Sequence, residues 1–282
     1  MVEVFPIGTR QYGRRVILRA GRPGSIGFEI SGLRMSFEIK RDGKPKPDRA
    51  TITIYNPNLD TISALEEEDI SVFLRAGYGD RPPEVFSGSA VDELEVKYDR
   101  KDRVVTIKAT DGGAEYRGAV LSESWVGPIG SLELIRRIAD TLGLGVGYLD
   151  EELEDVPYNQ GFVHAGAARD ALDKVVATSG GEWTIQDGEL IVSLIGKATA
   201  HQAVLLSRNS GLIGSPEKTK RGVKIKSLLN GRLLPGRVVQ VKALQYSGWY
   251  KIQTSTMRGD SGFSGEFYTE METKFVGEIG QI

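Results

Sequence analysis

Short runs in which apolar and polar side chains alternate recur along this chain, and turns rich in glycine separate them. Successive side chains of a strand point to opposite faces, so each run predicts a strand with one buried face. In the run 222–226, Val223 and Ile225 are expected inside, with Lys224 and Lys226 in water. The 35 glycines fit this pattern, because hairpin turns need residues that tolerate positive φ. The alternation therefore predicts a β-rich chain.

The C-terminal region has the densest series of strand and turn signals. Pro235-Gly236 supplies the fixed φ and the positive φ that a type II turn needs at its central positions. Segment 258–262 predicts another turn, followed by a last strand over 266–275. That strand is expected to point Phe267, Thr269, Met271, Thr273 and Phe275 to one face and Glu266, Tyr268, Glu270, Glu272 and Lys274 to the other. Such short strands are typical of a small antiparallel barrel or sandwich.

A hairpin is predicted near the N-terminus, where the runs 35–39 and 50–54 both alternate. After it, Asn58 is expected to cap a short helix over 59–67. The loop between the two runs is too polar to pack and too long for a tight turn. It is either an inert solvated tip or an arm that reaches a neighbouring acidic subunit. Its basic residues are Arg41, Lys44, Lys46 and Arg49.

The periodicity changes between about 116 and 195. Ser131 is expected to cap a helix that ends at Gly143, and a second helix is expected over 167–178. Asp187-Gly188 then predicts a tight hairpin in which Trp183 faces Val192. We therefore predict a mainly β chain with an α+β middle domain. Two small antiparallel β-barrel-like domains, 1–115 and 204–282, flank a helix-helix-hairpin domain, 116–203.

Several of these elements resemble those of the bacteriophage baseplate or tail-tip hub proteins, in the same order. The C-terminal series is Leu212-Ile-Gly-Ser-Pro216, Leu228-Leu-Asn230, Pro235-Gly236 and Gly259-Asp260 followed by an aromatic strand. The N-terminal stretches FEIKRDGKPKPDRATITIYNPN and VFSGSAVDEL…VVTIKATDGG match the first, tail-tube-like domain of these proteins in kind. The middle order of two helices and a tryptophan-bearing hairpin also looks like theirs.

The resemblance implies a structural hub rather than an enzyme, with no cofactor. It implies a homotrimer whose two barrels per chain give six similar lobes, so that a threefold spike joins a sixfold tail tube. The implied partners are the chain itself, the tail tube protein and the central spike protein, and contacts with the tape-measure protein and other baseplate proteins stay open. The implied location is the virion, at the tail tip or baseplate. Candidate interface residues are Arg41, Lys44, Lys46, Arg49, Glu266, Glu270, Glu272 and Lys274.

The residues themselves offer little for catalysis. There is no cysteine, and the two histidines have no metal-site spacing. Leu142-Gly-Leu-Gly-Val-Gly147 follows a helix instead of linking strand to helix, so it predicts a helix end rather than a dinucleotide site. The acidic clusters 66–69 and 151–155 are typical of solvated faces, because a glycosidase needs one carboxyl in an apolar pocket. We predict no catalytic, cofactor or metal site.

Net charge and the N-terminal sequence bear on partners and location. The net charge of −2 gives no field that favours nucleic acid, and the basic loop lacks the aromatic residues on which bases stack. No signal peptide or membrane span is visible, so we expect a soluble protein folded in the host cytoplasm, with no membrane partner. Two alternatives remain open: a cell-wall-degrading tail enzyme, and a carbohydrate- or nucleic-acid-binding barrel.

Overall fold

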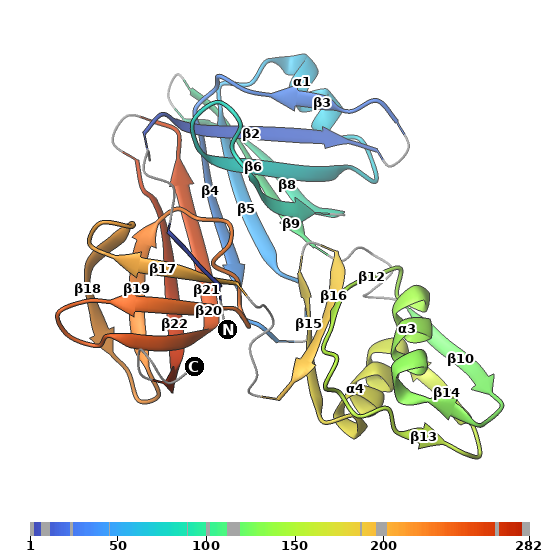
Figure 1. The fold of residues 1–282 in the computed structure, drawn as a ribbon. Coiled ribbons are helices and arrows are strands. Elements are labelled where there is room, and N and C mark those ends of the chain that lie inside the picture. The colour runs from blue at the N-terminus through green and yellow to red at the C-terminus, as the bar shows by residue number, and fades with distance from the viewer. Residues whose placement is uncertain are drawn as a thin grey trace. The chain divides into compact units, whose positions relative to one another are not determined.

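The structure is a computed structural model that describes residues 3–6, 12–22, 25–44, 46–88, 90–99, 102–111, 119–186, 188–195, 202–262 and 265–277. The chain is mainly β, as predicted (Figure 1). It forms two compact units. Met1–Gly43, Asp48–Thr110 and Ala200–Ile282 make the first, here called the β unit, and Lys44–Pro47 and Asp111–Thr199 make the second, here called the middle unit.

The N-terminal lobe of the β unit has two antiparallel sheets over one core. One sheet has the order β3 (Phe28–Ile30), β2 (Arg14–Gly21), β6 (Ser71–Tyr78) and β7 (Glu84–Gly88). The other contains β4 (Met35–Arg41), β5 (Arg49–Tyr55), β9 (Asp102–Thr110) and β8 (Ala90–Asp99). The predicted hairpin is confirmed, since Met35 faces Ile54, Phe37 faces Ile52, and all four are buried.

A short helix follows this hairpin, as predicted. Helix α1 (Leu59–Leu65) begins after Asn58, whose side-chain oxygen accepts a hydrogen bond from the Thr61 backbone N–H at 2.7 Å. This bond satisfies one of the free N–H groups at the start of the helix. Ile62 and Leu65 are buried, so the helix closes one part of the lobe's core.

The C-terminal lobe is one strongly bent sheet around a second core. Its strands are β1 (Glu3–Pro6), β17 (Gln202–Ser207), β18 (Leu212–Lys218), β19 (Val223–Leu228), β20 (Val238–Lys242), β21 (Gly248–Asp260) and β22 (Phe267–Gly277). The type II turn is confirmed: Gly236 has φ +86°, and the Arg237 N–H donates to the Leu234 carbonyl oxygen at 3.2 Å.

The turn predicted over 258–262 is wrong in its first half. Strand β21 continues through Gly259 to Asp260, and the chain turns only afterwards. A glycine followed by an aspartate is a common turn signal, but here Gly259 lies opposite Phe37 and Phe267 in the sheet. A Cβ at this position would overlap the Phe37 ring, so the glycine is needed for close packing rather than for a turn.

The two lobes are joined through one shared sheet. Residues Ser36–Arg41 of β4 pair antiparallel with Ser255–Asp260 of β21, a pairing here called the seam (Figure 1). The N-terminal core also takes in Leu229, Leu234, Met257 and Phe267 from the C-terminal region. The expected separation into domains 1–115 and 204–282 is therefore corrected. A continuous ladder and a shared core make them two lobes of one unit.

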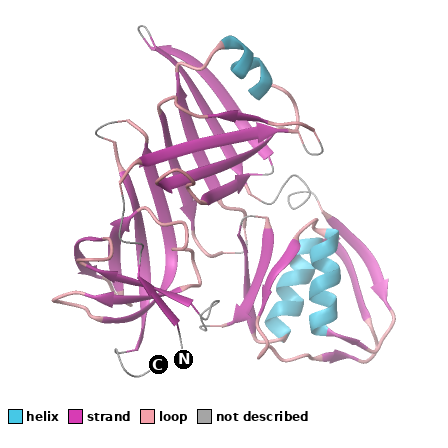
Figure 2. Cartoon of the chain, turned by 45° about the horizontal axis from the view of Figure 1, so that its top comes forward, coloured by secondary structure: helices cyan, strands magenta, loops and turns pink. Residues whose placement is uncertain are grey.

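The middle unit is α+β, as predicted. Helices α3 (Ser131–Thr141) and α4 (Ala168–Thr178) lie side by side, with a three-stranded sheet on one side and a two-stranded ribbon on the other (Figure 2). The sheet has the order β12 (Gly145–Leu149), β16 (Glu189–Leu194) and β15 (Gly181–Gln186). The ribbon pairs β10 (Val120–Trp125) with β14 (Phe162–Ala167), and a small ladder pairs β11 (Ile129–Gly130) with β13 (Pro157–Tyr158).

The expected cap of α3 is corrected. Gly130 is the N-cap, and Ser131 is the first helical residue, fully buried, with its hydroxyl accepting from the Val156 N–H at 2.9 Å. The capping acceptor is instead Asp155, which receives a hydrogen bond from the Leu132 N–H at 3.1 Å. One residue of the acidic cluster 151–155 thus has a local structural role. A negative side chain is favourable at a helix N-terminus.

The predicted hairpin of the middle unit has the expected register. Trp183 faces Val192 and Ile185 faces Leu190, and all four side chains are buried. Gly188 has φ +82°, while Asp187 lies outside the described residues. Gly143, with φ +66°, ends α3 and leads into β12, so segment 142–147 is a helix end followed by a strand, as predicted.

Candidate interface surfaces of the β unit

One face of the large sheet is polar over both lobes. It crosses seven neighbouring strands in the order β19, β22, β21, β4, β5, β9 and β8. Alternation along each strand sends the apolar side chains to the core and these side chains outward. We call this surface the polar face, and its members are Lys224, Lys226, Tyr268, Glu270, Glu272, Thr256, Arg258, Ser36, Glu38, Lys40, Thr51, Thr53, Thr106, Lys108, Glu93 and Glu95.

Opposite charges on the polar face are matched across neighbouring strands. Arg258 lies 2.6 Å from Glu38 across the seam and donates to the Tyr268 hydroxyl at 3.1 Å. Lys224 lies 3.0 Å from Glu270, and on β9 and β8 Lys108 lies 2.8 Å from Glu93. Cross-strand pairs of this kind stabilise a sheet modestly and leave little residual field.

The pairing shifts the protonation equilibria on this face. Hydrogen bonds from Lys40, and secondly from Arg258, lower the pKa of Glu38 below its usual value. The hydrogen bond to Glu270 raises the pKa of Lys224. Both shifts favour the charged forms, so neither group is tuned to exchange a proton near neutral pH. Glu38 and Lys224 are thus held as the charged partners of their ion pairs.

The basic loop is only partly a surface feature. Arg41 is buried, with its Nε 3.0 Å from Asp48 Oδ2 and an N–H donating to the Val85 carbonyl oxygen at 2.7 Å. The structure thus corrects its placement, because an alternating strand sends Arg41 to the core side of β4. Lys44, Lys46 and Arg49 are exposed. Lys44 belongs to the middle unit, where its carbonyl oxygen accepts a hydrogen bond from the Thr184 hydroxyl at 3.2 Å.

The four candidates on the last strand and the loop before it have different surroundings. Glu266 is exposed and accepts a hydrogen bond from the Tyr268 hydroxyl at 3.2 Å. Glu270 is half-buried against Lys224, whereas Glu272 and Lys274 are exposed on β22. Their role in contacts with other subunits stays a prediction. Arg258 and Glu38, which join the two lobes on this face, were missed because nothing local marks strands far apart in sequence as neighbours.

Ligand-binding chemistry is sparse in the described part of the chain. Within it, no group of three His, Asp or Glu side chains has metal-site geometry. No helix among the described residues is long and apolar enough to cross a bilayer. His164 Nε2 lies 3.0 Å from the Ala167 carbonyl oxygen, a local structural contact, and His201 lies outside the described residues.

Comparison with known proteins identifies the fold. No family model and no curated protein matches the sequence. A tail protein from Neisseria meningitidis MC58 matches with a TM-score of 0.64 and 13% identity, over 93% of this chain and 97% of its own. This chain has a tail-protein fold. The 43 kDa tail protein of prophage MuSo2 from Shewanella oneidensis gives a TM-score of 0.62 and 11% identity, over 93% and 98%.

A secretion-system protein has the same fold. It is an Escherichia coli component of the type VI secretion system, described as structurally similar to the T4 bacteriophage tail proteins gp27 and gp5. Its TM-score is 0.55 at 9% identity, over 87% of this chain and 74% of its own. The tail-protein fold therefore spans both lobes and the middle unit, which is the range over which the sequence resemblance was found.

Proposed function

We propose that this chain is the structural hub of a phage tail tip or baseplate. In this role it is a homotrimer with pseudo-sixfold symmetry that joins the tail tube to the central spike. The observation that carries the proposal is the seam, which holds two β lobes side by side in one chain. The likeness to tail proteins over 93% of the chain supports it.

Symmetry gives the physical reason. A trimer offers a hexameric ring six similar surfaces only if each chain contributes two. In this chain the two lobes share a continuous ladder, so their spacing is fixed within one sheet rather than by a linker. Two lobes linked only by a flexible segment would lose orientational freedom on binding, which would weaken assembly on the ring.

The proposed partners are other copies of the chain, the tail tube protein and the spike protein, within the virion tail. The exposed loop residues Lys44, Lys46 and Arg49 and the exposed Glu266, Glu272 and Lys274 are proposed to contact them. Among the described strands, β8 is a ten-residue edge strand of the large sheet, which offers a further place for subunit contacts. Unpaired strand edges are templates for pairing with another chain.

We also propose that the chain is not an enzyme. Ion pairs occupy Glu38, Glu270 and Glu93 on the polar face. The pKa of Glu38 is lowered by Lys40 and Arg258, and a carboxylate held in its charged form is a poor general acid. Peptidoglycan turnover by the purified chain would contradict this proposal and favour a tail-associated hydrolase.

The test is assembly with a counted stoichiometry. The purified chain is mixed with tail tube protein and examined by native mass spectrometry and electron microscopy. We expect three copies of the chain in a ring that caps a sixfold tube. A monomer that ignores the tube protein and degrades cell wall would overturn the hub, and specific retention of an oligosaccharide or oligonucleotide would favour a binding module.

A charge-reversal pair sharpens this test. Lys44→Glu with Lys46→Glu is expected to weaken assembly, because both side chains are exposed on the loop. The matched control is Lys220→Glu, which is also exposed but lies on the turn between β18 and β19. If the double variant and Lys220→Glu assemble equally well, the loop is not part of the interface. The proposed trimer would then be tested by the measured mass of the assembly alone.

A further inference from the structure

The ladder between β2 and β3 opens part-way along β2. Strand β6 pairs with β2 from Arg14 to Gly21, but β3 pairs only with Leu18 to Ala20. After Ile30 the chain leaves the sheet, and Gly32, with φ +77°, takes part in the bend toward β4. In the described part of the chain, no strand pairs with residues 14–17 of β2 on the side away from β6.

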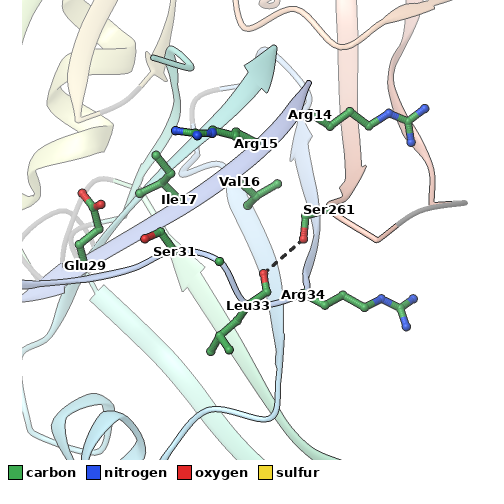
Figure 3. A pocket seen from close by; sticks show the side chains of 10 residues that line it. Arg14, Arg15, Val16, Ile17, Glu29, Ser31, Leu33, Arg34 and Ser261 are labelled. Atoms are coloured by element: carbon green, nitrogen blue, oxygen red, sulfur yellow. Dashed lines mark hydrogen bonds between the residues drawn. The ribbon is translucent and has the colours of Figure 1, made fainter. Parts of the chain in front are cut away.

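This fork encloses a groove of about 500 Å³. One wall is β2 from Arg14 to Ile17, and the other is segment 31–34 (Figure 3). The volume lies in the range of about 300–1,000 Å³ that is usual for binding sites. Figure 3 shows Val16 and Ile17 on the strand, with Ser31 and Leu33 on the segment that has left the sheet.

The far wall is held away from β2 by the C-terminal lobe. The Ser261 hydroxyl donates to the Leu33 carbonyl oxygen at 3.4 Å and accepts from the Met35 N–H at 2.9 Å. Arg34 donates two hydrogen bonds to Asp260, at 2.8 and 3.2 Å. These bonds draw the segment toward β21, so the fork stays open instead of closing into a longer β2–β3 ladder.

The groove offers backbone groups and a positive charge. Neighbouring residues of a strand direct their N–H and C=O groups to opposite sides, so two of the residues 14–17 direct theirs into the groove. Arg14, Arg15 and Arg34 line it. Two of them are in ion pairs, Arg15 with Asp80 at 3.4 Å and Arg34 with Asp260 at 2.8 Å, and the lining acid Glu29 is paired with Arg19 at 2.9 Å. Free strand edges recruit extended peptides, and the Arg15 and Arg34 side chains, both more than half exposed, form ion pairs weak enough for acidic side chains of a peptide to compete.

We propose that this groove binds an extended acidic segment of a partner protein, which adds to β2 as a strand. Backbone hydrogen bonds to residues 14–17 supply the affinity, and the arginines select acidic side chains. A small anion alone fits less well, because it offers no backbone groups to pair with the edge of β2 at residues 14–17. The proposal goes beyond the hub function, and it concerns the single chain.

The outer edge of β8, with which no described strand pairs, offers a useful contrast. Its outward side chains Glu93, Glu95 and Lys97 carry both signs, and Lys97 lies 2.7 Å from Glu95. The two acids outnumber the single lysine, so that edge is not expected to prefer an acidic peptide. An acidic peptide should therefore bind at the edge of β2 in preference to the edge of β8.

The experiment uses the full chain and a fluorescent six-residue peptide of alternating glutamate and valine. We expect saturable binding that weakens with salt, and slower hydrogen exchange at amides within residues 14–17. A peptide with lysine in place of glutamate should bind at least about tenfold more weakly, given two or more reversed charges. Protection of β8 instead of β2, or equal binding of both peptides, would overturn the proposal.

Two sets of variants locate the binding. Arg15→Glu should weaken binding of the glutamate peptide about tenfold by charge reversal, whereas the control Arg208→Glu, exposed on the turn after β17, should not. Arg15→Pro and Val16→Pro each remove one N–H, and only one of the two N–H groups points into the groove. The variant that loses the N–H facing β6 breaks the β2–β6 ladder and should melt at a lower temperature. The other variant loses the N–H that faces the groove, so it should keep its melting temperature and lose peptide binding. Unchanged binding in that variant, or in Arg15→Glu, would refute strand addition here.

Discussion

The two faces of the seam are built from the same strands, yet one is buried and closely packed while the other is exposed and ionic. On the inner face, Phe37 packs edge-on against Phe267 at 6.4 Å between ring centroids, over the bare backbone of Gly259. On the outer face, Arg258 of β21 reaches Glu38 of β4 across the seam. The inner contacts exclude water, and the outer contacts compete with it.

This difference separates the residues that hold the lobes together from those that are free to serve another purpose. Buried packing and buried charges are worth several kcal/mol because nothing replaces them when they are lost. Exposed ion pairs are worth about 0–1 kcal/mol, because water and salt replace them. We therefore expect substitutions on the inner face to weaken the β unit, and those on the polar face to leave it folded.

Arg41→Met should have the largest effect. It removes the cation from beside the Asp48 carboxylate, which is only 5% exposed, and it deletes the hydrogen bond to the Val85 carbonyl oxygen. Breaking a buried ion pair costs about 3–5 kcal/mol. The measurement is urea unfolding, with hydrogen exchange at β4 and β21 to assign the loss to the β unit.

The double variant Arg41→Met with Asp48→Leu tests the reason. If the cost comes from a buried uncompensated carboxylate, removing that carboxylate should restore part of the stability lost in Arg41→Met. A double variant that loses as much as the two single variants together would show that the two side chains act independently. The contrast between the faces would then rest on packing alone.

Gly259→Ala should come next. The added Cβ would overlap the Phe37 ring and lie 3.1 Å from Phe267, so the rings must move. Overpacking of this kind costs about 1–3 kcal/mol. The control is Gly145→Ala in β12, where the nearest atom to a new Cβ is the Glu189 Cγ at 3.8 Å. Comparable losses in the two variants would contradict the packing explanation.

The inner face also shows how far sequence reasoning reaches. The alternation pattern correctly predicted that Met35, Phe37 and Ile39 are buried and pair with Ala50, Ile52 and Ile54. The prediction was possible because the two runs are neighbours in the chain. Asn58 was identified as a cap for the same reason, since a cap bonds within three residues. Local rules suffice wherever the partners are close in sequence.

The pairing of β4 with β21 in the seam could not be predicted by such local rules. Arg258 and Glu38 are 220 residues apart, and alternation says which face a side chain takes but not which strand lies beside it. For the same reason Gly259 was interpreted as a turn residue, and Arg41 as part of a solvated loop. For the candidate interface residues, the sequence predicted only that they are exposed, which is correct for most of them. It could not predict which of them contact another subunit, because the pattern of one chain contains no information on its partners.

Glu38→Gln tests the polar face with a pH dependence. Because Lys40 and Arg258 lower the pKa of Glu38 in the folded chain, its contribution is fully present above the unfolded pKa and is lost as pH falls through the folded value. At pH 7 the variant should lose about 1 kcal/mol or less. The difference between wild type and variant should disappear in acid, and a difference that grows on acidification would contradict the pairing.

Lys224→Ala should have the smallest effect. The Lys224 and Glu270 side chains are 40% and 30% exposed, so a double-mutant cycle with Glu270→Ala should give a coupling of about 0.2–1 kcal/mol. Added salt should reduce the coupling further, because exposed pairs are screened over about 10 Å at 0.1 M. A coupling as large as that of Arg41 with Asp48, and insensitive to salt, would mean that the outer face also holds the sheet together. Charge reversal there would then be expected to unfold the β unit rather than to report on its partners.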